Sequence, residues 1–488
     1  MIKTNLNQVN LIESYLFKQL DQFDAKKLIS SELLDHQNLE LNFNFNKIGD
    51  EATFQLSEAL QSCSNIKSLK MYLKYNNIGN VGIDQIGIGI GKCIQLEDLM
   101  VDLRYNQIGD KGLCNFGTQL GKCTNLKNLI IYLHQNQIIG ENVSEFSKGL
   151  SNCINLSSLK IEISQSNIND DFVSSLSELN KCKNLTNLTL FLSNNKIEGS
   201  GLQDIKDFQN LQSLILDLQS NNIQEKQSVC IGLALENLKN LINLNIDLRS
   251  NSIKGFGAYY IGQGLAQNPN LQNLELNFFK NNIGDEGIID LGSGIAQCLH
   301  LNSAKIYLNE NDISDIGAQG LFHSIGNCQN LENLMLDLNR NKIQNENESN
   351  IGGGIGKCQN LKCLTLYMKF NQMREEGFFE LGNGIAKCQN LKHLEIHLNN
   401  NQIGFQQQNN LQLVMNSCVN LQELAISLKQ NKIGNNLSQN IIHGVSRCQN
   451  LIFVTVLFNQ NIVFWPLLKK IIKSIFKAKR VVRYNIKV

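Results

Sequence analysis

Apolar and polar residues alternate in short stretches that recur about every thirty residues. In one stretch, the apolar residues Leu394, Ile396 and Leu398 alternate with polar ones, and Asn401 follows three positions later. A period of two is typical of a β-strand that buries one face. The asparagine recurs, with Ile or Met two positions after it, at Asn46, Asn76, Asn106, Asn136, Asn195, Asn221, Asn251, Asn281, Asn311, Asn341, Asn371, Asn401 and Asn431, with Ser166 replacing it once and Asn461 in a degenerate last copy. We therefore expect one strand in each repeat.

The second half of each repeat predicts a helix. After Ile283 come Gly284 and Asp285, and then apolar residues four positions apart, Leu291 and Ile295. This order predicts a turn, an aspartate that caps its own helix, and a helix with one buried face. One strand and one helix per repeat predict parallel strands joined by helical crossovers in a right-handed coil. The fold class is therefore α/β.

The repeats resemble the leucine-rich repeat family, in the pattern L-x-x-L-x-L-x-x-N-x-I, over about residues 34–488. The long, helix-bearing unit is most similar to the ribonuclease-inhibitor-like subfamily. The resemblance implies a solenoid in the form of a horseshoe, with a parallel β-sheet on the concave face and helices on the convex face. It also implies that the recurrent asparagine bonds backbone groups where the chain leaves the sheet. Cysteines at helix ends resemble a cysteine-containing subfamily, at Cys63, Cys93, Cys123, Cys153, Cys182, Cys298, Cys328, Cys358, Cys388, Cys418 and Cys448.

Three regions follow from the period. Residues 1–33 lie outside it and carry apolar residues at helical spacing, which predicts an N-terminal helical cap or, alternatively, a partner-docking helix. Residues 34–463 form an array of about 14–15 units. The basic stretch 464–488 predicts a C-terminal capping helix and strand, although alone it also fits a basic amphipathic helix for a membrane surface, for calmodulin or for nuclear import. The shortened repeats after Ser166 and Asn195 predict the loss of about one helical turn and a local irregularity near 197–210.

Composition excludes several functional classes. The net charge is +1, which provides no general attraction to nucleic acid or to membranes. The first residues contain no secretory signal, and no apolar run approaches the roughly 18 residues of a membrane span. The fourteen cysteines include no C-x-x-C pair, so we expect reduced, buried thiols. These features predict a cytoplasmic protein that is not secreted, with a nuclear location as the alternative.

No constellation of residues predicts catalysis, and we expect no enzymatic activity, no cofactor and no metal. Glycine-rich stretches such as Gly87–Lys92 and Gly352–Lys357 fail as phosphate-binding loops because the first required glycine is absent and Cys follows the lysine. They lie within predicted helices, where each glycine costs about 1 kcal/mol relative to alanine. Their recurrence therefore predicts close approach of neighbouring helices.

Binding information is expected at the outward strand positions. Four positions before the recurrent asparagine, aromatic and acidic residues nearly alternate. Tyr and Arg are enriched among the residues that dominate protein interfaces. A first cluster of candidate partner-binding residues contains Tyr72, Lys74, Tyr75, Asp102, Arg104, Tyr105 and Tyr132. A second cluster contains Tyr307, Asp337, Arg340, Tyr367, Lys369 and Phe370.

The predicted function is a non-catalytic scaffold or adaptor that binds another protein through its concave face. The sequence does not identify that protein. One alternative is a regulator of a small GTPase, because activators of the nuclear-transport GTPase share this repeat type; the acidic C-terminal segment typical of them is absent here. The other is a substrate-binding subunit of a ubiquitin ligase, suggested by the helix-end cysteines, although residues 1–33 contain no recognisable ligase-recruiting box.

Overall fold

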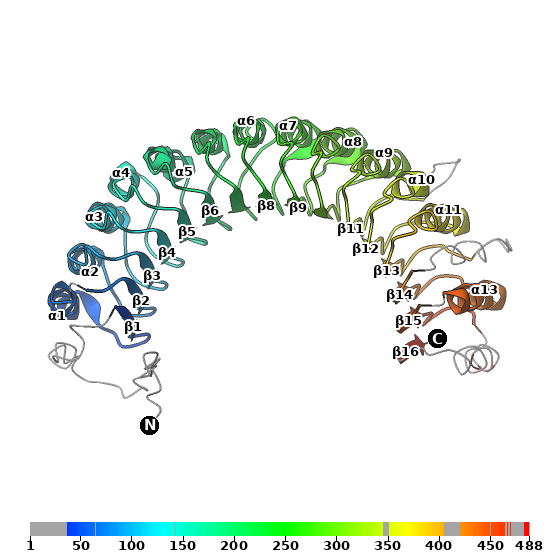
Figure 1. Cartoon of the computed structure of the whole chain (residues 1–488), viewed down its shortest axis with the longest axis horizontal. Helices are drawn as coiled ribbons and strands as arrows, with labels where there is room; N and C mark the ends of the chain where they lie inside the picture. The colour runs from blue at the N-terminus through cyan, green and yellow to red at the C-terminus, as the bar shows by residue number, and fades with distance from the viewer. Residues whose placement is uncertain are drawn as a thin grey trace, which may run out of the picture. The chain divides into compact units, whose positions relative to one another are not determined.

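The computed structural model describes residues 37–63, 65–141, 143–344, 351–404, 420–448, 450–463, 466, 469 and 483–487. The chain divides into two compact units, the first extending to Ser166 with the addition of Lys181–Asn184, and the second containing Asn167–Asn180 and the chain from Leu185 onward. In each unit the described helices lie on one side of a parallel β-sheet, and the other side, here called the open face, carries no helix among these residues (Figure 1). The predicted cap over residues 1–33, and most of the predicted helix after residue 464, lie outside the described residues.

The first unit alternates strands and helices without interruption. Its elements are β1 (Asn38–Asn42), α1 (Gly49–Gln61), β2 (Ser68–Tyr72), α2 (Asn80–Ile90), β3 (Asp98–Asp102), α3 (Asp110–Leu120), β4 (Asn128–Tyr132), α4 (Ser144–Leu150) and β5 (Ser158–Glu162). The strands pair in chain order, and each residue lies beside its equivalent thirty positions away, as Met71 does beside Val101. Equal repeat lengths therefore align equivalent side chains in columns across the sheet.

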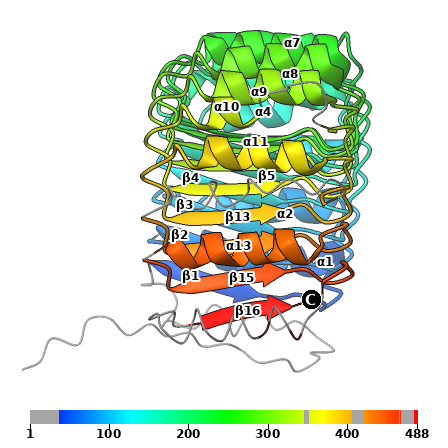
Figure 2. The same cartoon turned by 90° about the vertical axis from the view of Figure 1, so that its right-hand side faces the viewer.

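The second unit continues the same alternation. It contains β6 (Asn187–Phe191), β7 (Ser213–Asp217), α6 (Val229–Asn237), β8 (Asn243–Asp247), α7 (Lys254–Ala266), β9 (Asn273–Asn277), α8 (Gly284–Ile295), β10 (Ser303–Tyr307), α9 (Asp315–Ile325), β11 (Asn333–Asp337), α10 (Ile351–Ile355), β12 (Cys363–Tyr367), α11 (Glu375–Ile385), β13 (His393–His397), β14 (Glu423–Ser427), α13 (Asn435–Arg447), β15 (Phe453–Leu457) and β16 (Arg483–Lys487). Strands β6 to β16 pair in chain order, all parallel. Figure 2 shows β13, β15 and β16 running in one direction. The predicted α/β solenoid fold is confirmed.

The core lies between the sheet and the helices. The three alternating apolar positions of a strand all point into it: Leu129, Ile131 and Leu133 are fully buried. The residues between them point to the open face, as the period-two pattern predicts. The open face is therefore the surface on which the repeats differ in chemistry while their core stays the same.

The recurrent asparagine connects successive repeats, as the family resemblance implies. The side-chain oxygen of Asn311 accepts the N–H groups of Asn281 and Ile283 at 3.0 and 3.3 Å, and its amide donates to the carbonyl of Phe278 at 2.7 Å. Similar bonds recur at Asn106, Asn341 and Asn431. Because these backbone groups have left the sheet, the asparagine supplies partners that they would otherwise lack.

The aspartate after the turn does not cap its own helix, so that prediction was wrong. Helix α8 begins at Gly284, two residues earlier than predicted, which places Asp285 inside the first turn. Its carboxylate instead accepts the backbone N–H of Ser314 in the next repeat at 2.7 Å. Asp50 accepts the N–H of Gly79 in the same way at 2.6 Å. The aspartate thus stabilises the stacking of repeats rather than the start of one helix.

The shortened repeats use a different type of helix. Helix α5 (Asp170–Ser175) continues as the 3₁₀ helix η2 (Leu176–Lys181), and the next repeat contains only the 3₁₀ helix η3 (Ser200–Asp207). A 3₁₀ helix rises about 2.0 Å per residue instead of 1.5 Å, so eight residues span about 16 Å, the length of about eleven α-helical residues. The shortened repeats therefore span the same length with fewer residues by forming a 3₁₀ helix. The sequence had predicted an α-helix that is shorter by one turn.

The helix-end cysteines are hydrogen-bond donors in the core. The Cys298 thiol donates to the carbonyl of Leu265 in the preceding repeat at 3.4 Å. Asn268 takes this position in a repeat without the cysteine, and its amide donates to Leu235 at 2.8 Å. Burial raises the pKa of the Cys93, Cys298 and Cys328 thiols to about 12. The prediction of buried helix-end thiols is confirmed for those among the described residues. The raised pKa keeps Cys93, Cys298 and Cys328 protonated at neutral pH.

Candidate functional site

The residue just before each recurrent asparagine, here called the turn position, has a left-handed backbone. Its φ angle is 56° at Tyr75, Tyr105 and Phe370 alike. This conformation costs about 1 kcal/mol for most L-residues and less for asparagine, which occupies the same position at Asn194 and Asn400. An aromatic side chain at the turn position is therefore disfavoured by its own backbone.

Aromatic rings from successive turn positions nonetheless stack on one another in the first unit. The ring centroids of Phe45 and Tyr75 are 5.0 Å apart, and those of Tyr75 and Tyr105 are 4.2 Å apart. The edge of His134 contacts Tyr105 at 5.4 Å. Phe45 is 58% exposed and Tyr75 is 40% exposed. The sequence predicted Tyr75 and Tyr105 but missed Phe45, which the same turn position one repeat earlier could have identified.

Lys74 lies against this stack. Its ammonium nitrogen is 4.9 Å from the centroid of Tyr105, 5.2 Å from that of Tyr75 and 5.9 Å from that of Phe45. Within the described part of the chain it forms no ion pair with a carboxylate. The first cluster therefore contains a cation that lies beside three stacked aromatic rings and can meet an anion.

Arg104 is held differently from Lys74. Its guanidinium donates two hydrogen bonds to the carboxylate of Asp102, at 2.8 and 2.6 Å, and these bonds raise the pKa of Arg104. Asp102 is only 3% exposed, so its role is to orient Arg104. Asp102 occupies an outward strand position but is buried among its neighbours, and its direct contact with a partner stays a prediction.

Two tyrosines complete the first cluster. Tyr72 and Tyr132 flank Asp102 in register on β2, β3 and β4. The Arg104 guanidinium lies 5.2 Å from the ring centroid of Tyr132, and the Lys160 ammonium lies 5.0 Å from it. Burial and the charge of Glu40 raise the pKa of Tyr72, which stays protonated at neutral pH. All seven predicted residues thus lie on β2 to β4 and the turns that follow, and the sequence missed Lys160.

The second cluster lies on β10 to β12. Tyr307, Asp337 and Tyr367 are neighbours in register, and burial raises the pKa of the Asp337 carboxyl. The Lys369 ammonium lies 5.5 Å from the ring centroid of Tyr367. The Arg340 guanidinium lies 4.7 Å from that of Phe370, which is 47% exposed.

Two neighbours of the second cluster were not among the predicted residues. His397 stacks on Tyr367 at 4.9 Å, and Glu310 pairs with Arg340 at 3.7 Å. Both lie one repeat away from the residue they contact. The column four positions before the asparagine contains His397 and could have identified it.

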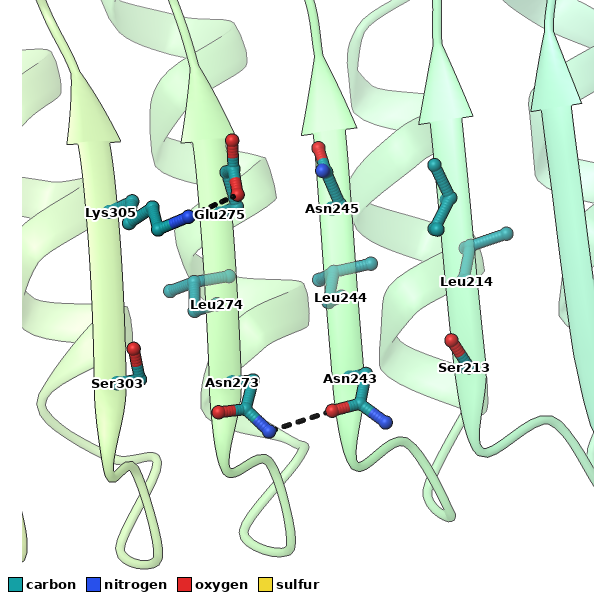
Figure 3. Close-up of a pocket in the computed structure, with 11 residues that line it drawn as sticks. Ser213, Leu214, Asn243, Leu244, Asn245, Asn273, Leu274, Glu275, Ser303 and Lys305 are labelled. Carbon is teal, nitrogen blue, oxygen red and sulfur yellow. Dashed lines mark hydrogen bonds and ion pairs between the residues drawn. The ribbon is translucent and has the colours of Figure 1, made fainter.

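A shallow depression of about 230 Å³ also lies on the open face, at the start of β7 to β10. Figure 3 shows Leu214, Leu244 and Leu274 side by side on neighbouring strands. Asn273 donates to Asn243 at 2.7 Å, and Lys305 pairs with Glu275 at 3.4 Å (Figure 3). Because these polar groups bond one another, the depression offers fewer unpaired polar groups to a ligand than the two clusters do.

One group resembles a nucleophile with its base. Cys363, His393 and Glu423 lie in register on β12, β13 and β14, and His393 Nδ1 is 3.2 Å from the Glu423 carboxylate. Burial raises the pKa of the Cys363 thiol, and the charge of Glu423 raises it further. A catalytic cysteine requires the opposite shift. The arrangement therefore does not produce an activated thiolate.

Comparisons with known proteins agree with this architecture. A family model described as leucine-rich repeat matches residues 100–114 and 267–292. The fold is similar to that of a leucine-rich-repeat protein of Leptospira interrogans, with a TM-score of 0.57 and 17% identity over 96% of this chain and 100% of that one. It is also similar to TLR13 in its complex with the RNA ssRNA13, with a TM-score of 0.50 and 18% identity over 88% of this chain and 59% of that one. No curated protein matches the sequence. Among the described residues, no helix is long and apolar enough to cross a membrane.

Proposed function

We propose that this chain is a leucine-rich-repeat protein that acts as a non-catalytic scaffold and binds another protein through the open face of its sheet. Stacked repeats form an extended surface whose outward residues vary while the framework stays the same. The first cluster is the principal binding surface in this proposal, and the second cluster is a further one. Such a protein requires no bound cofactor.

The observation that carries the proposal is the stack of Phe45, Tyr75 and Tyr105. Each ring occupies a left-handed backbone position where asparagine would cost less. The stack recovers part of that cost, since offset aromatic pairs contribute about 0.5–1.5 kcal/mol, but it leaves large rings exposed to water. Exposed aromatic and basic residues are the types that dominate binding at protein interfaces. A partner that covers the rings explains their presence better than folding does.

Charge balance favours a protein partner over nucleic acid. Around the strands of the first unit, outward positions carry equal numbers of cations and anions, namely Lys70, Lys74, Arg104 and Lys160 against Glu40, Asp98, Asp102 and Glu162. Binding to nucleic acid depends on neutralising several phosphates with unpaired Lys and Arg. The stacked rings also cover one another's faces, which leaves no gap for a base. The RNA bound by TLR13 is therefore not carried over to this chain.

The test replaces the two tyrosines by the residue that the chain itself uses at this position. We expect Tyr75→Asn combined with Tyr105→Asn to reduce capture of the partner at least about tenfold, while leaving the melting temperature unchanged or slightly raised. The partner is first identified by proximity labelling in the source cell, and capture is then measured with purified proteins. Gln135→Asn, at the same position beside the stack, is the control. Unchanged capture by the double variant would contradict the proposal.

A small GTPase remains the partner class that the repeat type suggests. A scaffold is expected to leave GTP hydrolysis by a panel of purified small GTPases unchanged at stoichiometric concentration. Stimulation that disappears in the double tyrosine variant would instead identify a GTPase regulator. Proximity labelling that recovers the core subunits of a ubiquitin ligase would favour the substrate-binding role.

The cysteine thiols, which form no disulfide among the described residues, fit a reducing compartment. The proposed location is therefore the cytoplasm, with the nucleus as the alternative.

A further inference from the structure

The same four-residue surface motif occurs twice. Residues 72–75 read Tyr-Leu-Lys-Tyr, and residues 367–370 read Tyr-Met-Lys-Phe. In both copies the tyrosine ends a strand, β2 or β12, the lysine is the next outward residue, and the aromatic ring occupies the turn position. Only the buried Leu73 or Met368 between them belongs to the framework. The outward residues of the two copies therefore match although the repeat does not require them to.

Both lysines are fixed in the same way. The backbone N–H of Lys74 donates to the side-chain oxygen of Asn44 at 2.9 Å, and that of Lys369 donates to Asn339 at 2.6 Å. The carbonyl of each lysine accepts the amide of its own recurrent asparagine, at 3.2 and 3.4 Å. Since the backbone is held on both sides, each lysine leaves the open face at the same point of its repeat before any ligand binds.

Both ammonium groups are available to an anion. Neither Lys74 nor Lys369 forms an ion pair within the described part of the chain, and the charge of Lys369 partly opposes the burial that raises the pKa of the nearby Asp337 carboxyl. Lys74 lies 5.2 Å from the turn-position ring of Tyr75, whereas Lys369 lies 5.5 Å from the strand-end ring of Tyr367. The rings displace part of the water around the cation, which strengthens its attraction to a single carboxylate. The exposed ring at the turn position offers an apolar contact beside it.

We propose that the two motifs are two sites for the same ligand, a short extended protein segment with one Asp or Glu beside an apolar residue. The carboxylate binds the lysine ammonium, and the apolar side chain packs on the ring of Tyr75 or Phe370. This inference rests on the proposed scaffold function and specifies the chemistry of its partner. Each chain then binds two such segments, from two partners or from one partner that carries both.

The chain contains a matched control. Lys429 occupies the same outward position as Lys74 and Lys369, and its backbone N–H donates to Asn399 at 2.9 Å. Ser427 and Gln430 replace the two aromatic residues of the motif. Lys429 therefore has the same backbone hold without the rings, and it separates the contribution of the motif from that of any surface lysine.

The experiment selects ligands from a random dodecapeptide phage library on the purified full chain. We expect the selected peptides to be enriched in Asp or Glu next to an apolar residue. Calorimetry with the best synthetic peptide is expected to give two sites per unmodified chain. Each of the single variants Lys74→Glu and Lys369→Glu should keep one site, and the double variant should keep none. The control Lys429→Glu should keep both sites. Replacing the peptide's acid by lysine is expected to weaken binding at least about tenfold.

The outcomes separate this inference from the proposed function. The twin-site inference would be overturned if the selected peptides showed no preference for Asp or Glu, or if calorimetry gave a single site that only Lys74→Glu removes. In either case the proposed scaffold function would still stand if Tyr75→Asn combined with Tyr105→Asn abolished binding of the partner. A selection in which no peptide depends on either cluster would overturn the scaffold function as well. Circular dichroism of each charge variant confirms that loss of binding does not arise from unfolding.

Discussion

Asn311→Ala is expected to lower the free energy of unfolding by about 3–5 kcal/mol. The Asn311 side chain is 0% exposed, and it bonds three backbone groups of the preceding repeat, the N–H groups of Asn281 and Ile283 and the carbonyl of Phe278. Alanine removes all three partners at once and leaves those groups buried. Each buried, unsatisfied polar group costs about 1–3 kcal/mol.

Urea denaturation followed by circular dichroism measures this effect, and hydrogen exchange locates it. Repeats contact mainly their neighbours, so the amides of Asn281, Ile283 and the adjacent helices should lose protection first. The control is Asn330→Ala, because the exposed Asn330 amide donates only to the carbonyl of Leu299, which water can bond instead. We expect this control to cost about 1 kcal/mol or less. An equal loss in both variants would show that burial of the asparagine is not the source of the effect.

Gly294→Ala is expected to destabilise the second unit by about 2–4 kcal/mol. A methyl group at Gly294 would overlap the backbone carbonyl of Gly262 on the neighbouring helix, and backbone atoms cannot move aside as a side chain can. Alanine favours a helix by about 1 kcal/mol over glycine, which is smaller than the cost of separating α7 from α8. The predicted reason for the recurrent helix glycines, close approach of neighbouring helices, is confirmed here and at Gly354, where a methyl group would meet the carbonyl of Phe322.

The comparison variant for this prediction is Gly434→Ala. An added methyl group there meets no atom within 4 Å, and the backbone is extended. Gly434 is the residue that precedes α13, so alanine is expected to cost about 1 kcal/mol or less there. Thermal and urea unfolding of the two variants should therefore separate clearly. A stabilised Gly294→Ala protein would mean that helix propensity outweighs the contact between α7 and α8.

For the first cluster, the sequence predicts which residues point to the open face, but it does not predict which neighbours those residues contact. The period placed Tyr75, Arg104 and Tyr105 on one surface, where Tyr75 stacks on Tyr105 and Arg104 bonds Asp102. It did not distinguish Arg104, which is paired with Asp102, from Lys74, which forms no ion pair within the described residues. That difference depends on which neighbour each side chain turns toward. It adds support of Arg104 to the role predicted for Asp102.

The sequence alone determined the repeat, the strand and helix of each unit, the buried face of each strand and the solenoid fold. These features are local, because a period of two or four along the chain fixes which side chains share a face, and a constant repeat length brings equivalent residues into register. Only the tertiary structure decided that Asp285 bonds the following repeat, that η3 replaces an α-helix, and that Phe45, Tyr75 and Tyr105 stack around Lys74. These features join residues about thirty positions apart, where the outcome depends on side-chain conformation and on the few ångströms between neighbouring repeats, which periodicity does not specify.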